Sequence, residues 1–413
     1  MDSVASLRVG RHAAITFAGV MAANVLGYIF YALVSRALGV DAYGTFSSLL
    51  AIVLIVASPA LIGQTVVAKL ATEFIGEAAL LSGLVRTIDR LTLGFAAAVA
   101  AALAALSVPI AAFLHLSDPL LVALAALSLC GAIVLPFLRG VLQGTSAFGP
   151  FALSAVAENL AKALFAPLLG AAAGLRGALG GMALAYAVAA GYTFVAARPH
   201  GRGIAVPLPL RPVLRTSAAV ALTVFCINLL LFYDVVLARR YLDPHTAGLY
   251  GAAALAGRAL FAVIGFVPIV LLPQAAGRSA RGERTRGLFV VALGSAALLA
   301  IAAIAFFAAF PHFTITTVAG RSFAEGAPYV VPYVYAVAML SLANITATYN
   351  VARGRMRFVV PLAGVALAEI VAVVLRHRTA TDLLQTIAIG HTVALLACTL
   401  SLGHSRVSES PSR

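Results

Sequence analysis

The residues of this chain that could do chemistry are charged side chains inside apolar runs long enough to cross a membrane. Glu158 and Lys162 lie in one such run, Arg258 in a second and Glu369 in a third. A charge inside a bilayer is costly unless it is paired, hydrated or bound to a ligand. With a rise of about 1.5 Å per residue, Glu158, Arg258 and Glu369 each lie roughly 15 Å into their runs, close to the bilayer midplane. These residues are therefore candidates for substrate binding, coupling or structural pairing.

The four charges allow different interactions. Glu158 and Lys162 stand at i and i+4, so they can pair on one face of a helix, as a structural clamp or as a coupling site. Glu369 has no cation one turn away, and it must pair across helices, stay protonated or face water. Arg258 is the main candidate for substrate binding, because a guanidinium can hold a pyrophosphate through two parallel hydrogen bonds. Pairing of Arg258 with Glu369 is the structural alternative.

Two further charged residues stand near the ends of their runs. Asp234 precedes Arg239 and Arg240 closely, and a salt bridge at the membrane rim is the favoured interpretation. Arg139 lies at the inner end of its run, where its guanidinium could contact lipid headgroups or the phosphate of a substrate.

Patterns for catalysis, metal binding and nucleotide binding are missing from the sequence. It contains no G-x-S-x-G, H-E-x-x-H, Walker A or C-x-x-C motif. Cys130, Cys226 and Cys398 stand far apart in apolar runs, which indicates packing. His391, in the last apolar run, is interpreted as a packing histidine. We therefore predict no catalytic residue, metal or cofactor, and a protein that is not an enzyme.

Composition places the chain in a membrane. Of its 413 residues, 62% are hydrophobic and 10% are charged, whereas about a quarter of a soluble domain is charged. The net charge of +14 does not predict nucleic-acid binding, because the basic residues are spread over short loops without a basic stripe. With both termini in the cytoplasm, 19 of the 28 Lys and Arg residues lie on the cytoplasmic side and 7 on the other. This asymmetry predicts a multi-pass protein of the inner (cytoplasmic) membrane with cytoplasmic termini.

Twelve apolar runs predict an all-α polytopic membrane protein with two six-helix lobes. The predicted spans are 13–35, 45–68, 91–114, 119–141, 149–171, 178–197, 214–235, 248–273, 287–310, 328–350, 357–376 and 382–402. A basic, proline- and glycine-rich segment divides them. We expect an N-terminal lobe at 1–200, a cytoplasmic linker at 201–213 and a C-terminal lobe at 214–413.

The two halves of the sequence are similar to each other. The segment from Asn24 to Phe46 matches the segment from Asn228 to Tyr250 at an offset of 204 positions, mainly at polar residues and glycines. An even number of spans in each half makes the repeat parallel. Asn24 and Asn228 are therefore predicted to occupy corresponding places, where each amide binds a neighbouring helix or a shared substrate site.

Three stretches resemble one transporter family. The motif LVSRALGVDAYGTFSSLLA (33–51) and the motif QGTSAFGPFALSAVAENLAKALFAPLL (143–169) are similar to the first half of polysaccharide-export flippases, and RRYLDPHTAGLY (239–250) is similar to the second half. These flippases belong to the multidrug/oligosaccharidyl-lipid/polysaccharide exporter superfamily. The resemblance implies two lobes around a central cavity, and the movement of lipid-linked sugars or drugs by alternating access.

Three functions follow as hypotheses. The first is a flippase for a glycan linked to a polyprenyl pyrophosphate, working among membrane lipids and beside glycan-assembly proteins. The second is a cation-coupled multidrug or toxin antiporter of the same fold, which the absence of a carboxylate from the first span disfavours. The third is a structural subunit of a glycan-synthase complex, which no residue specifically favours.

Overall fold

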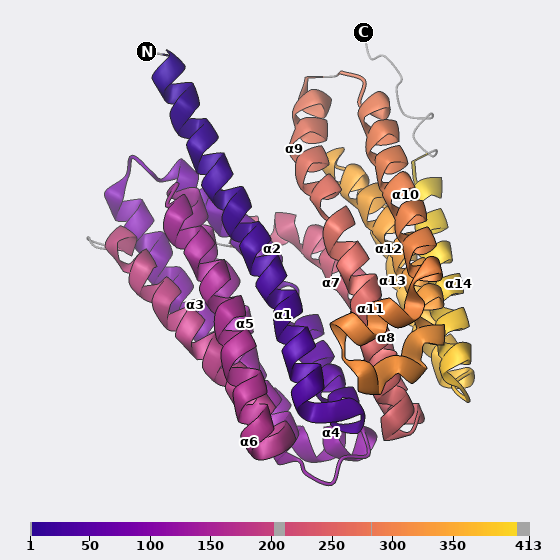
Figure 1. Cartoon of the computed structure of the whole chain (residues 1–413). Coiled ribbons are helices and arrows are strands. Elements are labelled where there is room, and N and C mark those ends of the chain that lie inside the picture. The colour runs from indigo at the N-terminus through magenta and orange to yellow at the C-terminus, as the bar shows by residue number, and fades with distance from the viewer. Residues whose placement is uncertain (1, 202–210, 282, 403–413) are drawn as a thin grey trace. The chain divides into compact units, whose positions relative to one another are not determined.

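The computed structural model describes residues 2–201, 211–281 and 283–402, and every regular element within these ranges is helical (Figure 1). The all-helical membrane fold predicted from composition is confirmed. Most of the predicted linker at 201–213 lies outside the described residues, because the description stops at Gly201 and resumes at Arg211.

Contacts divide the chain into two compact units, Met1–Ala218 and Ala219–Arg413, which we call the first and second lobes. The helices that begin in the first lobe are α1 (Asp2–Ala57), α2 (Ala60–Glu73), α3 (Ala78–Ala105), α4 (Ser107–Phe113), α5 (Leu120–Gly144), α6 (Phe148–Ala197), the short 3₁₀ helix η1 (Arg198–Gly201) and α7 (Arg211–Tyr241). The division between Ala218 and Ala219 lies inside α7.

The second lobe contains the rest of α7 and the remaining helices. These are α8 (Pro244–Ile264), α9 (Phe266–Ala280), α10 (Arg286–Ala309), α11 (Pro311–Val318), η2 (Arg321–Gly326), α12 (Ala327–Ala352), α13 (Val359–Leu375) and α14 (Ala380–Leu400).

Two long helices are each broken by a glycine with positive φ. Gly39 interrupts α1 at φ 74°, and Gly174 interrupts α6 at φ 59° and ψ −144°. Residues with a β-carbon rarely adopt such backbone angles, whereas glycine adopts them at low cost. Nine helices of the described residues are long and apolar enough to cross a membrane. The number of spans becomes twelve when α1 and α6 count as two spans each and the shorter apolar α13 is added. This number agrees with the prediction.

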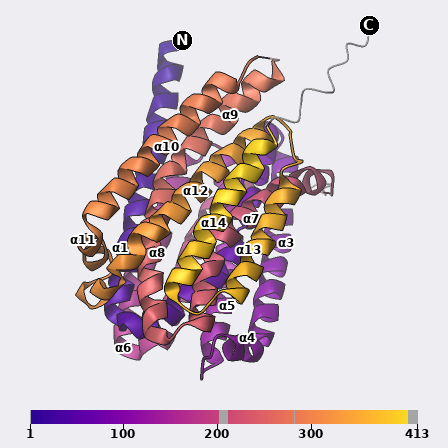
Figure 2. The ribbon, with the colours of Figure 1, turned by 90° about the vertical axis from the view of Figure 1, so that its right-hand side faces the viewer.

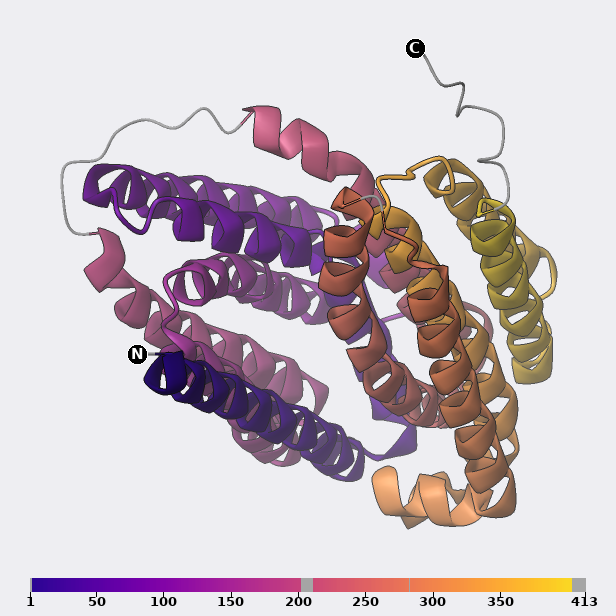
Figure 3. The ribbon, with the colours of Figure 1, turned by 90° about the horizontal axis from the view of Figure 1, so that it is seen from above.

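The first lobe is packed through small residues. A β-carbon at Gly140 or Gly144 of α5 would lie 2.6 Å from the carbonyl oxygen of Gln64 or 2.3 Å from that of Ala68, both on α2. Glycines four residues apart let helix backbones approach closely, which is how helices associate in lipid. The end-on view of Figure 3 shows the same lobe with α1 alongside α6, its main contact.

The second lobe is built around α12. This helix contacts α8, α9, α10 and α14, and α14 lies between α12 and α13 (Figure 2). Large apolar side chains cover the outer surface of the lobe, among them Val291, Val360 and Leu375. Exposed apolar side chains of this size suit contact with lipid.

Candidate functional site

The first lobe contains a buried charged cluster centred on Glu158. One carboxylate oxygen of Glu158 forms the ion pair with Lys162 that their spacing predicts. The other oxygen lies 2.7 Å from Nη2 of Arg139, which reaches across from α5 to α6. Arg139 therefore has a carboxylate partner within the lobe, and its contact with lipid headgroups or with the phosphate of a substrate stays a prediction.

Ser154 holds Arg139 in this position. Its Nε donates to Oγ of Ser154 at 2.9 Å, and its Nη2 donates to the Ser154 carbonyl at 2.9 Å. Oγ of Ser154 lies 2.6 Å from Oγ1 of Thr193 in the second half of α6. The guanidinium is therefore fixed by the backbone and side chains of α6 as well as by Glu158.

Lys162 has a second contact, with Tyr186. Its ammonium lies 4.1 Å from the centroid of the Tyr186 ring, a cation–π distance. Tyr186 packs against Gly131 of α5, where a β-carbon would lie only 2.6 Å from Cβ of the tyrosine. Glycine at position 131 thus lets α5 approach the backbone and Cβ of Tyr186, the residue whose ring contacts the lysine.

The cluster carries more positive than negative charge. Arg139 and Lys162 share the single carboxylate of Glu158, which leaves one formal positive charge. The three side chains are 14%, 11% and 12% exposed, in the order Arg139, Lys162 and Glu158. An excess cation in a poorly hydrated place favours the binding of an anion.

The second lobe has its own buried cluster around Asp234, which is 1% exposed. Tyr250 of α8 donates a hydrogen bond to Oδ2 of Asp234 at 2.9 Å. Arg258, also on α8, interacts electrostatically with Asp234, and its guanidinium lies 4.6 Å from the ring centroid of Phe232. Tyr333 of α12 interacts with both Asp234 and Arg258.

These contacts correct two expectations. The predicted salt bridge of Asp234 with Arg239 and Arg240 at the rim is wrong, because the carboxylate is buried and turned toward α8 and α12. The alternative pairing of Arg258 with Glu369 is also wrong, because Asp234 on α7 takes that place. The depth of a residue along its helix does not reveal which neighbouring helix it faces.

Glu369 on α13 is held by a tyrosine and a histidine. Tyr233 donates a hydrogen bond to its Oε1 at 2.7 Å, and Nε2 of His391 lies 3.4 Å from the same oxygen. The His391 ring is also within hydrogen-bond distance of the carbonyls of Ala336 at 2.9 Å and Leu230 at 3.2 Å. His391 therefore ties α14 to α7 and α12, which extends its predicted packing role.

The second carboxylate oxygen of Glu369 is enclosed. A β-carbon at Gly390 would lie 2.0 Å from Oε2, so only glycine leaves room for the carboxylate there. Among the described residues, Oε2 of Glu369 and Oδ1 of Asp234 are buried without a hydrogen-bond partner. Each oxygen could accept a proton or a cation.

The repeat-related asparagines lie one in each lobe. Asn228 donates to the carbonyl of Val224 in its own helix at 2.9 Å. Asn24 is half-buried on α1. Their shared role at a substrate site stays a prediction.

Sequence reasoning missed the aromatic and hydroxyl partners of these charges. Four of these partners are neutral tyrosines in apolar helices, which the pattern of charges does not mark: Tyr186, Tyr233, Tyr250 and Tyr333. Their signal in the sequence is the phenolic hydroxyl itself, because a buried hydroxyl group needs a hydrogen-bond partner. Among the described residues, no group of three or more His, Cys, Asp or Glu side chains could hold a metal ion.

Comparisons with known proteins identify the fold. A scan with protein-family models finds no match, and a search of curated proteins finds none. Among solved structures, an inward-facing multidrug resistance MATE family transporter of the MOP superfamily is similar with a TM-score of 0.72 and 14% identity, over 91% of this chain and 92% of that one. The lipid II flippase MurJ in an inward closed conformation is similar with a TM-score of 0.70 and 11% identity, over 94% of this chain and 87% of that one.

A third similar structure is a MOP superfamily transporter from Pyrococcus furiosus, described as having a binding pocket of reverse polarity. Its TM-score is 0.56 at 15% identity, over 95% of this chain and 93% of that one. The chain therefore has the fold that these MOP superfamily transporters and the lipid II flippase share.

Proposed function

We propose that the protein is a flippase that moves a lipid-linked oligosaccharide or polysaccharide precursor across the cytoplasmic membrane by alternating access. Two findings support this proposal. The chain shares its fold with the lipid II flippase MurJ, and its sequence motifs resemble those of polysaccharide-export flippases. The proposal includes cytoplasmic termini, as the charge asymmetry of the loops predicts.

The observation that carries the proposal is the surplus positive charge of the first-lobe cluster. A pyrophosphate needs cationic partners in a region where water is scarce. Arg139 is fixed by Glu158 and Ser154, whereas Lys162 donates to Glu158 from the end of a flexible stem and can present a remaining N–H to a phosphate. We assign the contact with the phosphate to Lys162.

The second lobe has a supporting role in this proposal. Arg258 interacts with Asp234, so it starts from a paired state and can contact a phosphate only by sharing its guanidinium. Asn24 and Asn228 would donate hydrogen bonds to the sugar or the phosphate.

One observation favours a second function, a cation-coupled antiporter. Oε2 of Glu369 and Oδ1 of Asp234 are buried acceptors without hydrogen-bond partners among the described residues. Binding of a proton or Na⁺ at these oxygens would neutralise buried negative charge, as coupling to an ion gradient requires.

Thermal stabilisation of the purified protein separates the two functions. A ligand at about 100 times its Kd stabilises the folded state by about 2.7 kcal/mol, which raises Tm by roughly 5–10 °C for a lobe of this size. We expect a polyprenyl pyrophosphate to produce such a rise in the wild type and little or none in Lys162→Gln. Lys69→Gln is the matched control, because Lys69 is an exposed lysine that also pairs with a glutamate four residues away.

The possible changes of Tm distinguish the flippase from the antiporter. A rise that persists undiminished in Lys162→Gln would remove this lysine from the site. If polyprenyl pyrophosphate has no effect on the wild type, while Na⁺ or acid changes Tm in the wild type and not in Glu369→Gln, the antiporter is favoured. Restored surface glycan in a strain lacking its own flippase would then test transport directly.

A further inference from the structure

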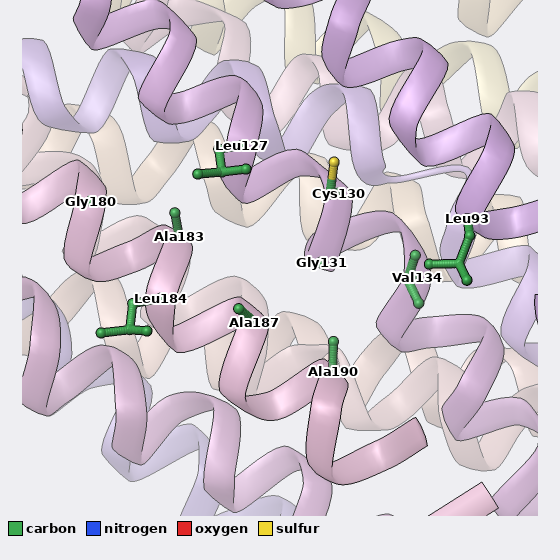
Figure 4. A pocket seen from close by; sticks show the side chains of 10 residues that line it. All are labelled: Leu93, Leu127, Cys130, Gly131, Val134, Gly180, Ala183, Leu184, Ala187 and Ala190. Carbon is green, nitrogen blue, oxygen red and sulfur yellow. The ribbon is translucent and has the colours of Figure 1, made fainter. Parts of the chain in front are cut away.

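The first lobe has an apolar cavity on its outer surface that the proposed transport does not use. It has a volume of about 440 Å³ and lies between α3, α5 and α6. We call it the slot, and its lining residues are Leu93, Leu127, Cys130, Gly131, Val134, Gly180, Ala183, Leu184, Ala187 and Ala190. Figure 4 shows the small side chains of Ala183, Ala187 and Ala190 pointing from α6 toward α5, with Leu93 of α3 at one end.

The shape of the slot follows from its small residues. Glycine and alanine form most of the α6 wall, while Leu93, Leu127 and Leu184 form an exposed rim. In a membrane, such a depression is filled by hydrocarbon, because a void loses dispersion contacts on both of its walls. The space suits one hydrocarbon chain.

Two helices lead from the slot to arginines at one end. On α3, Arg86, Arg90 and Leu93 stand at i, i+4 and i+7, so both exposed arginines lie on the helix face that lines the slot. The rise per residue places Arg90 roughly 4.5 Å beyond Leu93 along the axis. This end of α3 lies on the cytoplasmic side in the predicted orientation.

The wall on α6 continues in the same way. Ala190, Phe194 and Arg198 stand four residues apart, and the Arg198 guanidinium lies 4.9 Å from the Phe194 ring centroid. Arg198 also interacts with Asp89 of α3, which brings the ends of the two helices together. With three arginines and one aspartate, this end of the slot is cationic.

We propose that the slot binds one anionic phospholipid of the cytoplasmic leaflet. Its phosphate lies between Arg90 and Arg198, and one acyl chain lies along Ala190, Ala187 and Ala183. Basic residues next to an apolar surface attract anionic headgroups. This site belongs to the first lobe alone, and its existence does not depend on the proposed transport.

The absence of tryptophan from the sequence permits a direct test. Leu184→Trp places a single fluorophore on the rim of the slot. Val291→Trp, on α10 of the second lobe and 70% exposed, is the control for ordinary contact with bulk lipid. The full-length variants are reconstituted in phosphatidylcholine vesicles that contain either brominated phosphatidylglycerol or brominated phosphatidylcholine, and quenching is compared at equal mole fractions.

We expect the Leu184→Trp fluorophore to prefer brominated phosphatidylglycerol by roughly five-fold or more in relative binding constant, since each basic residue near the surface contributes about that factor. The Val291→Trp fluorophore should show no preference. Arg90→Gln with Arg198→Gln, added to Leu184→Trp, should remove the preference. Ala187→Phe should reduce quenching by both lipids because it fills the slot.

Three results would overturn the proposal. Equal quenching by both lipids at Leu184→Trp would mean that only bulk lipid covers the slot. A preference that survives the double arginine substitution would show that the headgroup is held elsewhere. Displacement of the phosphatidylglycerol by an equal mole fraction of polyprenyl phosphate would assign the slot to a prenyl chain instead. Size-exclusion chromatography verifies that each variant is folded, and the single arginine variants replace the double one if it is not.

Discussion

The sharing of Glu158 by two cations makes a quantitative prediction about stability. Replacing Glu158 by Gln leaves Arg139 and Lys162 without their counterion. Two cations on opposite oxygens of one carboxylate stand on the order of 6 Å apart, and at an effective dielectric constant of about 20 they repel each other by roughly 3 kcal/mol. Removal of one partner from a buried ion pair costs about 3–5 kcal/mol, so we expect Glu158→Gln to lower stability by that amount.

Replacing Lys162 by Met has a smaller effect, because Arg139 still neutralises Glu158 at 2.7 Å. The free energy of unfolding falls by the contribution of one charged hydrogen bond, about 1.5–3 kcal/mol. The double variant Glu158→Gln/Lys162→Met removes the repulsion as well as the pair. We therefore expect the double variant to be more stable than Glu158→Gln alone, by roughly 3 kcal/mol less any lost packing.

Thermal melting followed by far-ultraviolet circular dichroism measures these differences. At roughly 2–4 °C per kcal/mol, Glu158→Gln should lower Tm by on the order of 10 °C, and the second substitution should recover most of this. Lys69→Met is the control, since an exposed ion pair contributes about 1 kcal/mol or less. A loss of Tm from Lys162→Met as large as that from Glu158→Gln, or two losses that simply add, would show that the two cations do not share the carboxylate.

Two further substitutions test other parts of the structure. Gly390→Ala should destabilise the second lobe and lower Tm, because its β-carbon would fall 2.0 Å from Oε2 of Glu369. In the background of Glu369→Ala, the same substitution should be tolerated. An equal fall of Tm in both backgrounds would contradict this. Arg176, 2.7 Å from Asp118, holds the pKa of that carboxyl below its ordinary value of 3.8. A carboxyl whose pKa is lowered in the folded state stabilises the protein at pH values above its ordinary pKa, and this stabilisation is lost as pH falls through the lowered pKa. Asp118→Asn should therefore flatten the fall of Tm between about pH 5 and pH 3. An unchanged slope would show that the pair is not formed.

The class of the fold could be predicted from the amino-acid sequence alone. Long apolar runs with few charges leave helices that cross a membrane as the solution that satisfies every backbone group. The pairing of Glu158 with Lys162 was also predictable, because residues at i and i+4 share a helix face regardless of what surrounds the helix.

The helices that supply the other partners of the buried charges are known only from the tertiary structure. Periodicity gives the face of a residue and its depth, but it does not say which helix lies opposite that face. Arg139 could not be assigned to Glu158 from spacing, because the two are on different helices joined by a turn. The same holds for Arg258 beside Asp234.

The environment of Glu369 shows the same limit at longer range. Its carboxylate meets Tyr233 from a helix 136 residues earlier in the chain, and it fits only because position 390 on the next helix is a glycine. Such contacts are set by the close packing of whole helices, where a single β-carbon decides whether a carboxylate can enter. Sequence patterns located the charges of this protein, and helix packing assigned their partners.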